Sequence, residues 1–173
     1  MTTVAATSTP ISLDLTIICQ DCVVGEHVTI GKGTVLHPKA SITSLHGAPI
    51  TIGENNIIEE LVSIVNRSKE PMIIGAGNLF EVGSVIECKS IGNENIVEAK
   101  AKVSCGVTIN NGCTIGAGCI TPENEHYLDN SIVSGPTLHR INSTIPLEMH
   151  SATHIKHLEF LHKTLPNFHN MKK

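Results

Sequence analysis

The chain has 173 residues, a net charge of −4 and an isoelectric point near 6.2. This length fits one domain, and the acidic balance argues against nucleic acid as a partner, because nucleic-acid binding needs a basic patch. Hydrophobic residues make up 40% of the chain, yet it holds only three Phe, one Tyr and no Trp. The core is therefore expected to be filled by aliphatic side chains.

Two further features of the sequence bear on the cellular compartment in which the protein is expected. No stretch approaches the roughly 20 apolar residues of a membrane span, so we expect no direct membrane insertion. The first ten residues, Met1 to Pro10, lack the charged and apolar regions of a signal peptide. We therefore expect a cytoplasmic protein whose six cysteines are free thiols in a reducing compartment.

Aliphatic side chains recur every six residues over most of the chain. This period suits neither an amphipathic helix nor an alternating strand, but it is typical of a short strand followed by a corner, three times per coil. The inward positions fall on three faces, which we label a, b and c. Face a holds Val24, Ile42, Ile64, Ile86 and Val103; face b holds Ile30, Ile52, Ile74, Ile91 and Ile109; face c holds Leu36, Ile58, Phe80, Val97 and Ile115.

The repeat has three adjustments of register, and all of them fall between face a and face b. The steps from Ile42 to Ile52 and from Ile64 to Ile74 each carry four extra residues, in the loops Thr43–Pro49 and Asn66–Pro71; the step from Ile86 to Ile91 loses one. Because the irregularities stack on one corner, the register is self-consistent. We predict an all-β fold, a single-stranded parallel β-helix of about five coils over residues 11–142. Its left hand is implied by resemblance to the hexapeptide-repeat family.

The fourth residue after each inward position is expected to be small or amide-bearing. After face b this set is Asn56, Asn78, Asn95 and Cys113. Stacked asparagines can hydrogen-bond along the coil axis, so we interpret them as a structural ladder.

Beyond Thr121-Pro122 the repeat fades, and residues 130–142 look irregular. From Pro146 the period becomes helical, with Ile155, Leu158, Leu161 and Leu165 on one stripe and Pro166 as the stop. A helix of about 18 residues is about 27 Å long, which matches the prism, so the segment 143–173 is expected to pack along one outer face. Its histidines could pair at i,i+4 on a metal, but no Cys or carboxylate cluster completes a site; they are His150, His154, His157 and His162.

The cysteines are interpreted as packing residues rather than as a redox or zinc site. Cys19 and Cys22 form a lone CxxC without a second pair, and Cys22, Cys113 and Cys119 occupy small fourth positions. Cys88 and Cys105 hold equivalent places on successive coils, where a disulfide is not expected in the cytosol.

Two enzyme classes share this type of fold. The stretch from Ile52 to Ile64 resembles the γ-class carbonic anhydrases, but two of that family's metal-binding histidines fall on Glu60 and Val65, leaving only His46 as a candidate. Hexapeptide acyltransferases use a His general base, for which His27, His37 and His46 are candidates by location alone. We predict no catalytic residue, metal ligand or cofactor.

An acidic stripe is the one candidate for partner binding. Glu59, Glu81 and Glu98 each follow a face-c residue, so they stack about 4.8 Å apart at one outer corner. The stripe could be a solvated ladder screened by water and salt, or a surface that a basic partner neutralises.

The chain resembles the dynactin subunit 6 family from about Ile18 to Lys173. The motifs that carry the resemblance are VTIG (28–31), HPKA (37–40), NNIIEE (55–60), PMIIG (71–75), NLFEVG (78–83) and the LPNFH and MKK ending. The resemblance implies a non-catalytic, cytoskeleton-associated scaffold subunit that pairs with dynactin subunit 5 and other pointed-end subunits of dynactin. It also implies a role in dynein-driven cargo transport along microtubules.

Overall fold

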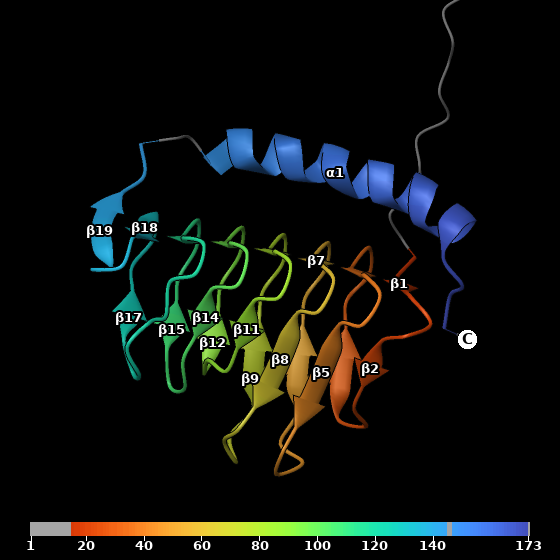
Figure 1. Ribbon diagram of the computed structural model, residues 1–173, viewed down its shortest axis with the longest axis horizontal. Coiled ribbons are helices and arrows are strands. Elements are labelled where there is room, and N and C mark those ends of the chain that lie inside the picture. The colour runs from red at the N-terminus through yellow and green to blue at the C-terminus, as the bar shows by residue number, and fades with distance from the viewer. Residues whose placement is uncertain (1–14, 145–146, 173) are drawn as a thin grey trace, which may run out of the picture.

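The computed structural model describes residues 15–144 and 147–172. Its short parallel strands stack into a three-sided left-handed β-helix, and one helix lies along the length of this prism (Figure 1). Each coil adds one strand to each of three sheets, which correspond to the predicted faces a, b and c.

The strands are short because each inward side chain is followed by a corner. The face-a sheet contains β2 (Val23–Val24), β5 (Ser41–Ser44), β8 (Ser63–Asn66), β11 (Val85–Ile86) and β14 (Lys102–Val103). The face-b sheet contains β3 (Val28–Ile30), β6 (Ile50–Ile52), β9 (Met72–Ile74), β12 (Ser90–Ile91), β15 (Thr108–Ile109) and β17 (His126–Tyr127). The face-c sheet contains β1 (Ile17–Ile18), β4 (Val35–Leu36), β7 (Ile57–Ile58), β10 (Leu79–Phe80), β13 (Ile96–Val97), β16 (Thr114–Ile115) and β18 (Ser131–Ser134), with β19 (His139–Asn142) antiparallel at its end.

The predicted register is confirmed at every inward position. Ile64, for example, pairs with Ile42 on one side and with Ile86 on the other, and Phe80 lies between Ile58 and Val97. These side chains form one continuous aliphatic core that runs through the prism. The loops at 43–49 and 66–71 lie together at the corner between faces a and b, as predicted (Figure 1).

The repeat continues further than predicted. Tyr127 pairs with Ile109, and Val133 pairs with Ile115, so the expectation that the repeat fades after Pro122 was wrong. The hydrophobic pattern did not reveal this last coil, because its inward position on face a is occupied by Thr121, which is buried. The neighbouring Ile120 points outward. Six coils therefore separate Ile18 from Val133, instead of about five; the intervening face-c positions are Leu36, Ile58, Phe80, Val97 and Ile115.

The C-terminal helix, α1 (Leu147–Phe168), packs along the outside of the face-c sheet (Figure 1). Leu158, Leu161 and Leu165 are buried there, as predicted, against an apolar row that includes Val35 and Ile57.

Two details of the predicted helix were wrong. Ile155 is 44% exposed, because the inward stripe runs from Leu158 back to His154 and not to Ile155. Pro166 does not end the helix, which continues to Phe168. A proline in the last turn removes only one backbone donor, and the N–H of His169 still bonds to the carbonyl of Leu165 at 2.9 Å.

After the helix, the chain returns to the first coil. Met171 forms an antiparallel bridge with Cys19, the N–H of Gln20 donates to the carbonyl of Asn170 at 2.8 Å, and the N–H of Lys172 donates to the carbonyl of Ile18 at 2.8 Å. The segment 170–172 thus covers the edge of the first coil at residues 18–20.

The predicted division into residues 11–142 and 143–173 stays a prediction. Its first boundary lies outside the described residues, and β1 begins at Ile17. Among the described parts of the chain, no helix has the length and apolar character needed to span a membrane.

Docking of the helix can be tested with a pair of substitutions. Leu158→Asp should lower the free energy of unfolding by at least about 2 kcal/mol, since it removes a fully buried leucine and adds an uncompensated carboxylate. Phe160→Asp, on the exposed side of the same helix, should have an effect below about 1 kcal/mol. Urea unfolding of both variants measures this. Equal stabilities would mean that the helix does not pack on the sheet.

Candidate functional site

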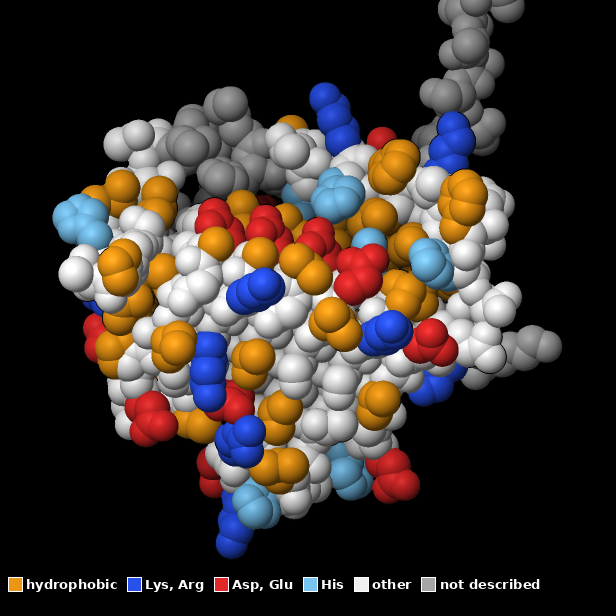
Figure 2. Space-filling model, in the orientation of Figure 1, with side chains coloured by type: hydrophobic (Ala, Val, Ile, Leu, Met, Phe, Trp, Pro, Cys, Tyr) orange, Lys and Arg blue, Asp and Glu red, His pale blue; other side chains and the backbone are white. Residues whose placement is uncertain are grey.

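The structure places Glu59, Glu81 and Glu98 in one line along the corner between faces c and a. Each residue follows an inward side chain of β7, β10 or β13, and these strands are neighbours in the face-c sheet. A row of acidic side chains is visible along the prism beside α1 (Figure 2). The predicted stacking is therefore confirmed, whereas a role in partner binding stays a prediction.

Each carboxylate of this acidic ladder also has a structural task that sequence reasoning missed. An oxygen of Glu59 accepts the backbone N–H of Val82 at 2.9 Å on the next coil. Glu81 accepts that of Ala99 at 3.0 Å, and Glu98 accepts that of Ala117 at 2.8 Å. Each bond engages the Oε2 atom, so the other oxygen can contact a partner. Charge-assisted hydrogen bonds of this kind are strong, so they offset the repulsion between neighbouring glutamates.

One coil before Glu59, the same corner holds a histidine instead of a glutamate. His37 is buried, and its Nδ1 atom lies 3.0 Å from Oε1 of Glu60. Burial alone would raise the pKa of Glu60, but the hydrogen bond with His37 and the nearby charges of His37 and His169 hold it below its usual value. The sequence did not reveal this carboxylate partner, because the two residues are 23 positions apart.

The His37–Glu60 pair resembles half of a general-base arrangement, but its geometry does not expose a reactive atom. The Nε2 atom of His37, which would take the proton, is buried and has no hydrogen-bond partner. The other two candidates, His27 and His46, are exposed in the corner region between faces a and b. The three histidines are thus not brought together on one site.

The asparagine ladder is confirmed. The side-chain amide of Asn78 donates to Oδ1 of Asn56 at 3.0 Å, and that of Asn95 donates to Oδ1 of Asn78 at 3.0 Å. The same oxygens accept the backbone N–H groups of Asn78 and Asn95, each at 2.9 Å, and Asn95 accepts that of Cys113 at 2.7 Å. All four residues are buried, so the ladder satisfies backbone donors that water cannot reach.

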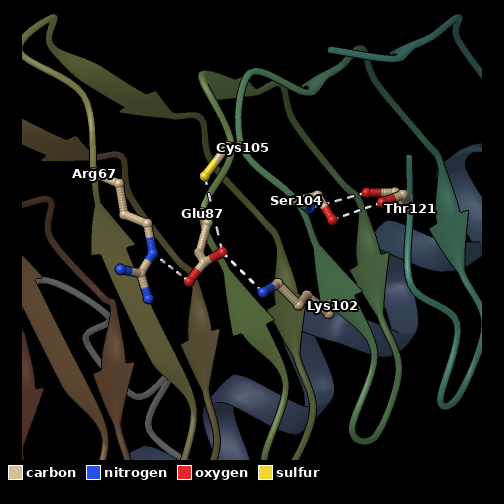
Figure 3. A network of polar contacts seen from close by, with 6 residues as sticks. All are labelled: Arg67, Glu87, Lys102, Ser104, Cys105 and Thr121. Carbon is tan, nitrogen blue, oxygen red and sulfur yellow. Dashed lines mark hydrogen bonds and ion pairs between the residues drawn. The ribbon is translucent and has the colours of Figure 1, made fainter. Parts of the chain in front are cut away.

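A network of charged groups ties three coils together on face a (Figure 3). Glu87 is buried, and its carboxylate lies 2.6 Å from Nε of Arg67 and 3.0 Å from Nζ of Lys102. Burial would raise the pKa of Glu87, but these two cations outweigh it and leave the pKa below its usual value. Beside it, Ser104 on the coil of Lys102 pairs with Thr121 on the following coil through two hydrogen bonds of 2.9 and 2.6 Å. The network fixes the loop at 66–71 to the prism.

Five of the six cysteines are buried, as expected of packing residues, and Cys105 is half-buried. All six are free thiols, and Sγ of Cys22 donates to the carbonyl of His37 at 3.0 Å, as Cys113 does to Leu128. Burial, helped by neighbouring Cys22, raises the pKa of Cys19 to about 11, and burial raises that of Cys88 to about 12. These thiols are therefore protonated at neutral pH and are poor nucleophiles or metal ligands.

Two helix histidines hold α1 to the prism. Nε2 of His154 donates to the carbonyl of Asn55 at 2.7 Å, and Nε2 of His162 donates to the carbonyl of Gly33 at 3.1 Å. The side chain of His150 lies outside the described residues. Within the described chain, no three residues among His, Cys, Asp and Glu lie close enough together to hold a metal ion.

The burial of His154 predicts how the stability of the fold depends on pH. Burial, with the nearby charge of His157, lowers the pKa of His154 below 6.5 although Asn55 and Glu94 oppose this. Below about pH 6.5 the unfolded chain thus binds more protons than the folded one, so stability falls as the pH drops. Urea unfolding at pH 8 and at pH 5.5 measures how much unfolding free energy is lost on acidification. This loss should be smaller for His154→Gln, whose side chain can still donate to Asn55, than for the wild type. Equal losses in both proteins would contradict this account.

Comparisons with known proteins agree with the geometry. No family model matches the chain. Among solved structures, a hexapeptide transferase family protein from Anaplasma phagocytophilum aligns with a TM-score of 0.58 at 12% identity, over 87% of this chain and 93% of that one. A UDP-N-acetylglucosamine acyltransferase from Bacteroides fragilis aligns with a TM-score of 0.53 at 17% identity, over 90% of this chain and 69% of that one. The protein is therefore of the hexapeptide-repeat, left-handed β-helix class, and these two likenesses establish its fold alone.

Curated relatives narrow the class to a family. Dynactin subunit 6 of Dictyostelium discoideum is 52% identical over 169 residues, which cover 96% of this chain and 89% of the relative. Dynactin subunit 6 of Nematostella vectensis is 39% identical, over 98% of this chain and 97% of the relative. The chain belongs to the dynactin subunit 6 family.

Proposed function

We propose that the protein is a non-catalytic scaffold subunit of the pointed-end complex of dynactin. In this role it pairs with dynactin subunit 5 and supports dynein-driven cargo transport along microtubules, in the cytoplasm and in association with the cytoskeleton. The observation that carries the proposal is membership of the dynactin subunit 6 family, at 52% identity over almost the whole chain.

The residues at the candidate catalytic positions support a non-catalytic role. Glu60, which stands where a metal-binding histidine is expected in the γ-class carbonic anhydrases, is engaged by His37. Val65, at the second such position, is a half-buried aliphatic residue on β8. The interior of the prism is filled by packed side chains.

The acidic ladder is the proposed contact to a neighbouring subunit. Glu59, Glu81 and Glu98 are half-buried and lie in a line, so a basic surface could engage several of them at once. Opposite charges arranged in this way favour association rate and specificity over raw affinity.

Purification of the protein from its native cells under mild conditions tests the proposal. Recovery in a large complex that contains actin-related proteins and dynactin subunit 5 is the expected result. If the protein is instead recovered without other subunits, and the purified protein binds acyl-CoA stoichiometrically, the proposal is overturned in favour of an acyltransferase.

A further inference from the structure

A groove of about 600 Å³ lies between the first half of α1 and the face-c sheet. Leu79 and Ile96 line it from β10 and β13, Ile155 and His157 line it from the helix, and Glu94 lines it from the corner between faces b and c. Further along the helix the same apolar row of the sheet is covered by Leu158, Leu161 and Leu165. Beside the groove this row is left half-exposed at Leu79 and Ile96.

The groove and the acidic ladder belong to one surface. Leu79 and Ile96 point outward from the face-c sheet, and Glu81 and Glu98 follow them two residues later, at the corner where β10 and β13 end. Figure 2 shows hydrophobic side chains next to the acidic row, in the hollow below the helix. The apolar strip therefore has carboxylates along one edge and Glu94 at the other.

The charges around the groove decide what can occupy it. No Lys or Arg is among the described residues that line it. Phosphate-bearing partners, such as nucleic acid or an anionic lipid, would be repelled by the carboxylates. A partner with an apolar stripe flanked by Lys or Arg would match both the floor and the edge.

The spacing of the ladder favours a helix as the occupant. Neighbouring coils lie about 4.8 Å apart, so Glu59 and Glu98 are about 10 Å apart along the axis. In an α-helix, residues i and i+7 are also about 10 Å apart, and the pitch is about 5.4 Å. The geometry points to this groove as the docking site for a basic amphipathic helix of another polypeptide. The inference deepens the proposed scaffold function and rests on it only for the source of that helix.

The test uses the full-length chain and a synthetic 18-residue helical peptide with Leu at i, i+3, i+4 and i+7 and Lys on the flanks. Two control peptides replace Lys by Glu or Leu by Ser. The Leu/Lys peptide is expected to bind in a salt-dependent manner, and both controls are expected to bind at least tenfold more weakly. Absence of binding by the Leu/Lys peptide would overturn the inference.

Variants locate the binding. Ile96→Lys and, independently, Ile155→Lys should weaken binding at least tenfold, because each places a cation in the groove. Val85→Lys, at the matching outward position of β11 on face a, should leave binding unchanged. An equal loss in Val85→Lys, or no loss in either groove variant, would show that the peptide binds elsewhere.

A charge-matched pair of double variants tests the ladder. Glu81→Gln with Glu98→Gln should weaken binding severalfold at low salt and flatten its salt dependence, while Gln can still accept the backbone N–H groups. Glu26→Gln with Glu123→Gln changes the net charge equally at exposed sites and should have little effect. Equal effects of the two double variants would contradict the ladder's part in docking.

The inference and the proposed function can fail separately. Peptide binding is measured on the isolated chain, whereas scaffold function is measured by recovery of the wild-type chain with dynactin. Loss of peptide binding with normal recovery would overturn only the groove. Absence of the wild-type chain from dynactin would overturn only the scaffold function.

Discussion

Ile74→Asp is expected to abolish cooperative folding. Ile74 lies in β9 with 1% of its surface exposed, between Ile52 and Ile91 of the adjoining coils. Removing a buried isoleucine side chain typically costs about 2–5 kcal/mol, and an unpaired buried carboxylate adds several more. Because whole domains are stable by only about 5–15 kcal/mol, the variant should be insoluble or lack a thermal transition.

The adjacent residue provides the control. Ile73 lies in the same strand but points outward and is 56% exposed. Ile73→Asp should therefore stay soluble and melt within a few degrees of the wild type. A scanning calorimetry trace of Ile74→Asp that matched the wild type would show that the register of the repeat is wrong.

The second large effect is expected for Asn78→Ala. The Asn78 side chain bonds to Oδ1 of Asn56 and the carbonyl of Gly92, and it accepts the backbone N–H of Asn95. Truncation leaves several buried polar groups without partners, at about 1–3 kcal/mol each. We expect a loss of about 3 kcal/mol or more in the free energy of unfolding, measured by urea denaturation.

Asn93→Ala is the matched control, because Asn93 also accepts a backbone N–H from the preceding coil, that of Ala76, at 2.8 Å. This bond is exposed, and water can replace it. The control should lose less than about 1 kcal/mol. Similar losses in the two variants would mean that burial does not set the strength of the ladder.

The sequence predicted the prism well because its signal is periodic and repeated. Fifteen inward positions, read with three adjustments, all have their predicted neighbours, for instance Ile86 beside Ile64 and Val103. The pattern failed where single residues broke it. Thr121 occupies an inward place with a hydroxyl that bonds to Ser104, and hydropathy alone cannot identify such a position.

The candidate site was predicted less completely, because contacts between coils depend on side-chain direction. The line of Glu59, Glu81 and Glu98 followed from the register, but their bonds to backbone N–H groups of the next coil did not. The groove could not be predicted either. It exists because the inward stripe of α1 runs through His154 and leaves Ile155 beside Leu79 and Ile96.

The return of the chain to the first coil has a consequence for how the molecule opens. A solenoid whose units contact only their neighbours can fray from either end. Here residues 170–172 bond to residues 18–20 of the first coil, while α1 rests on several of the coils between the two ends. Opening of the first coil must therefore also release the last residues of the chain, which raises the free energy of that local event. We expect the amides of β1 to exchange with solvent as slowly as those in the middle of the prism, so that the array opens as one cooperative unit.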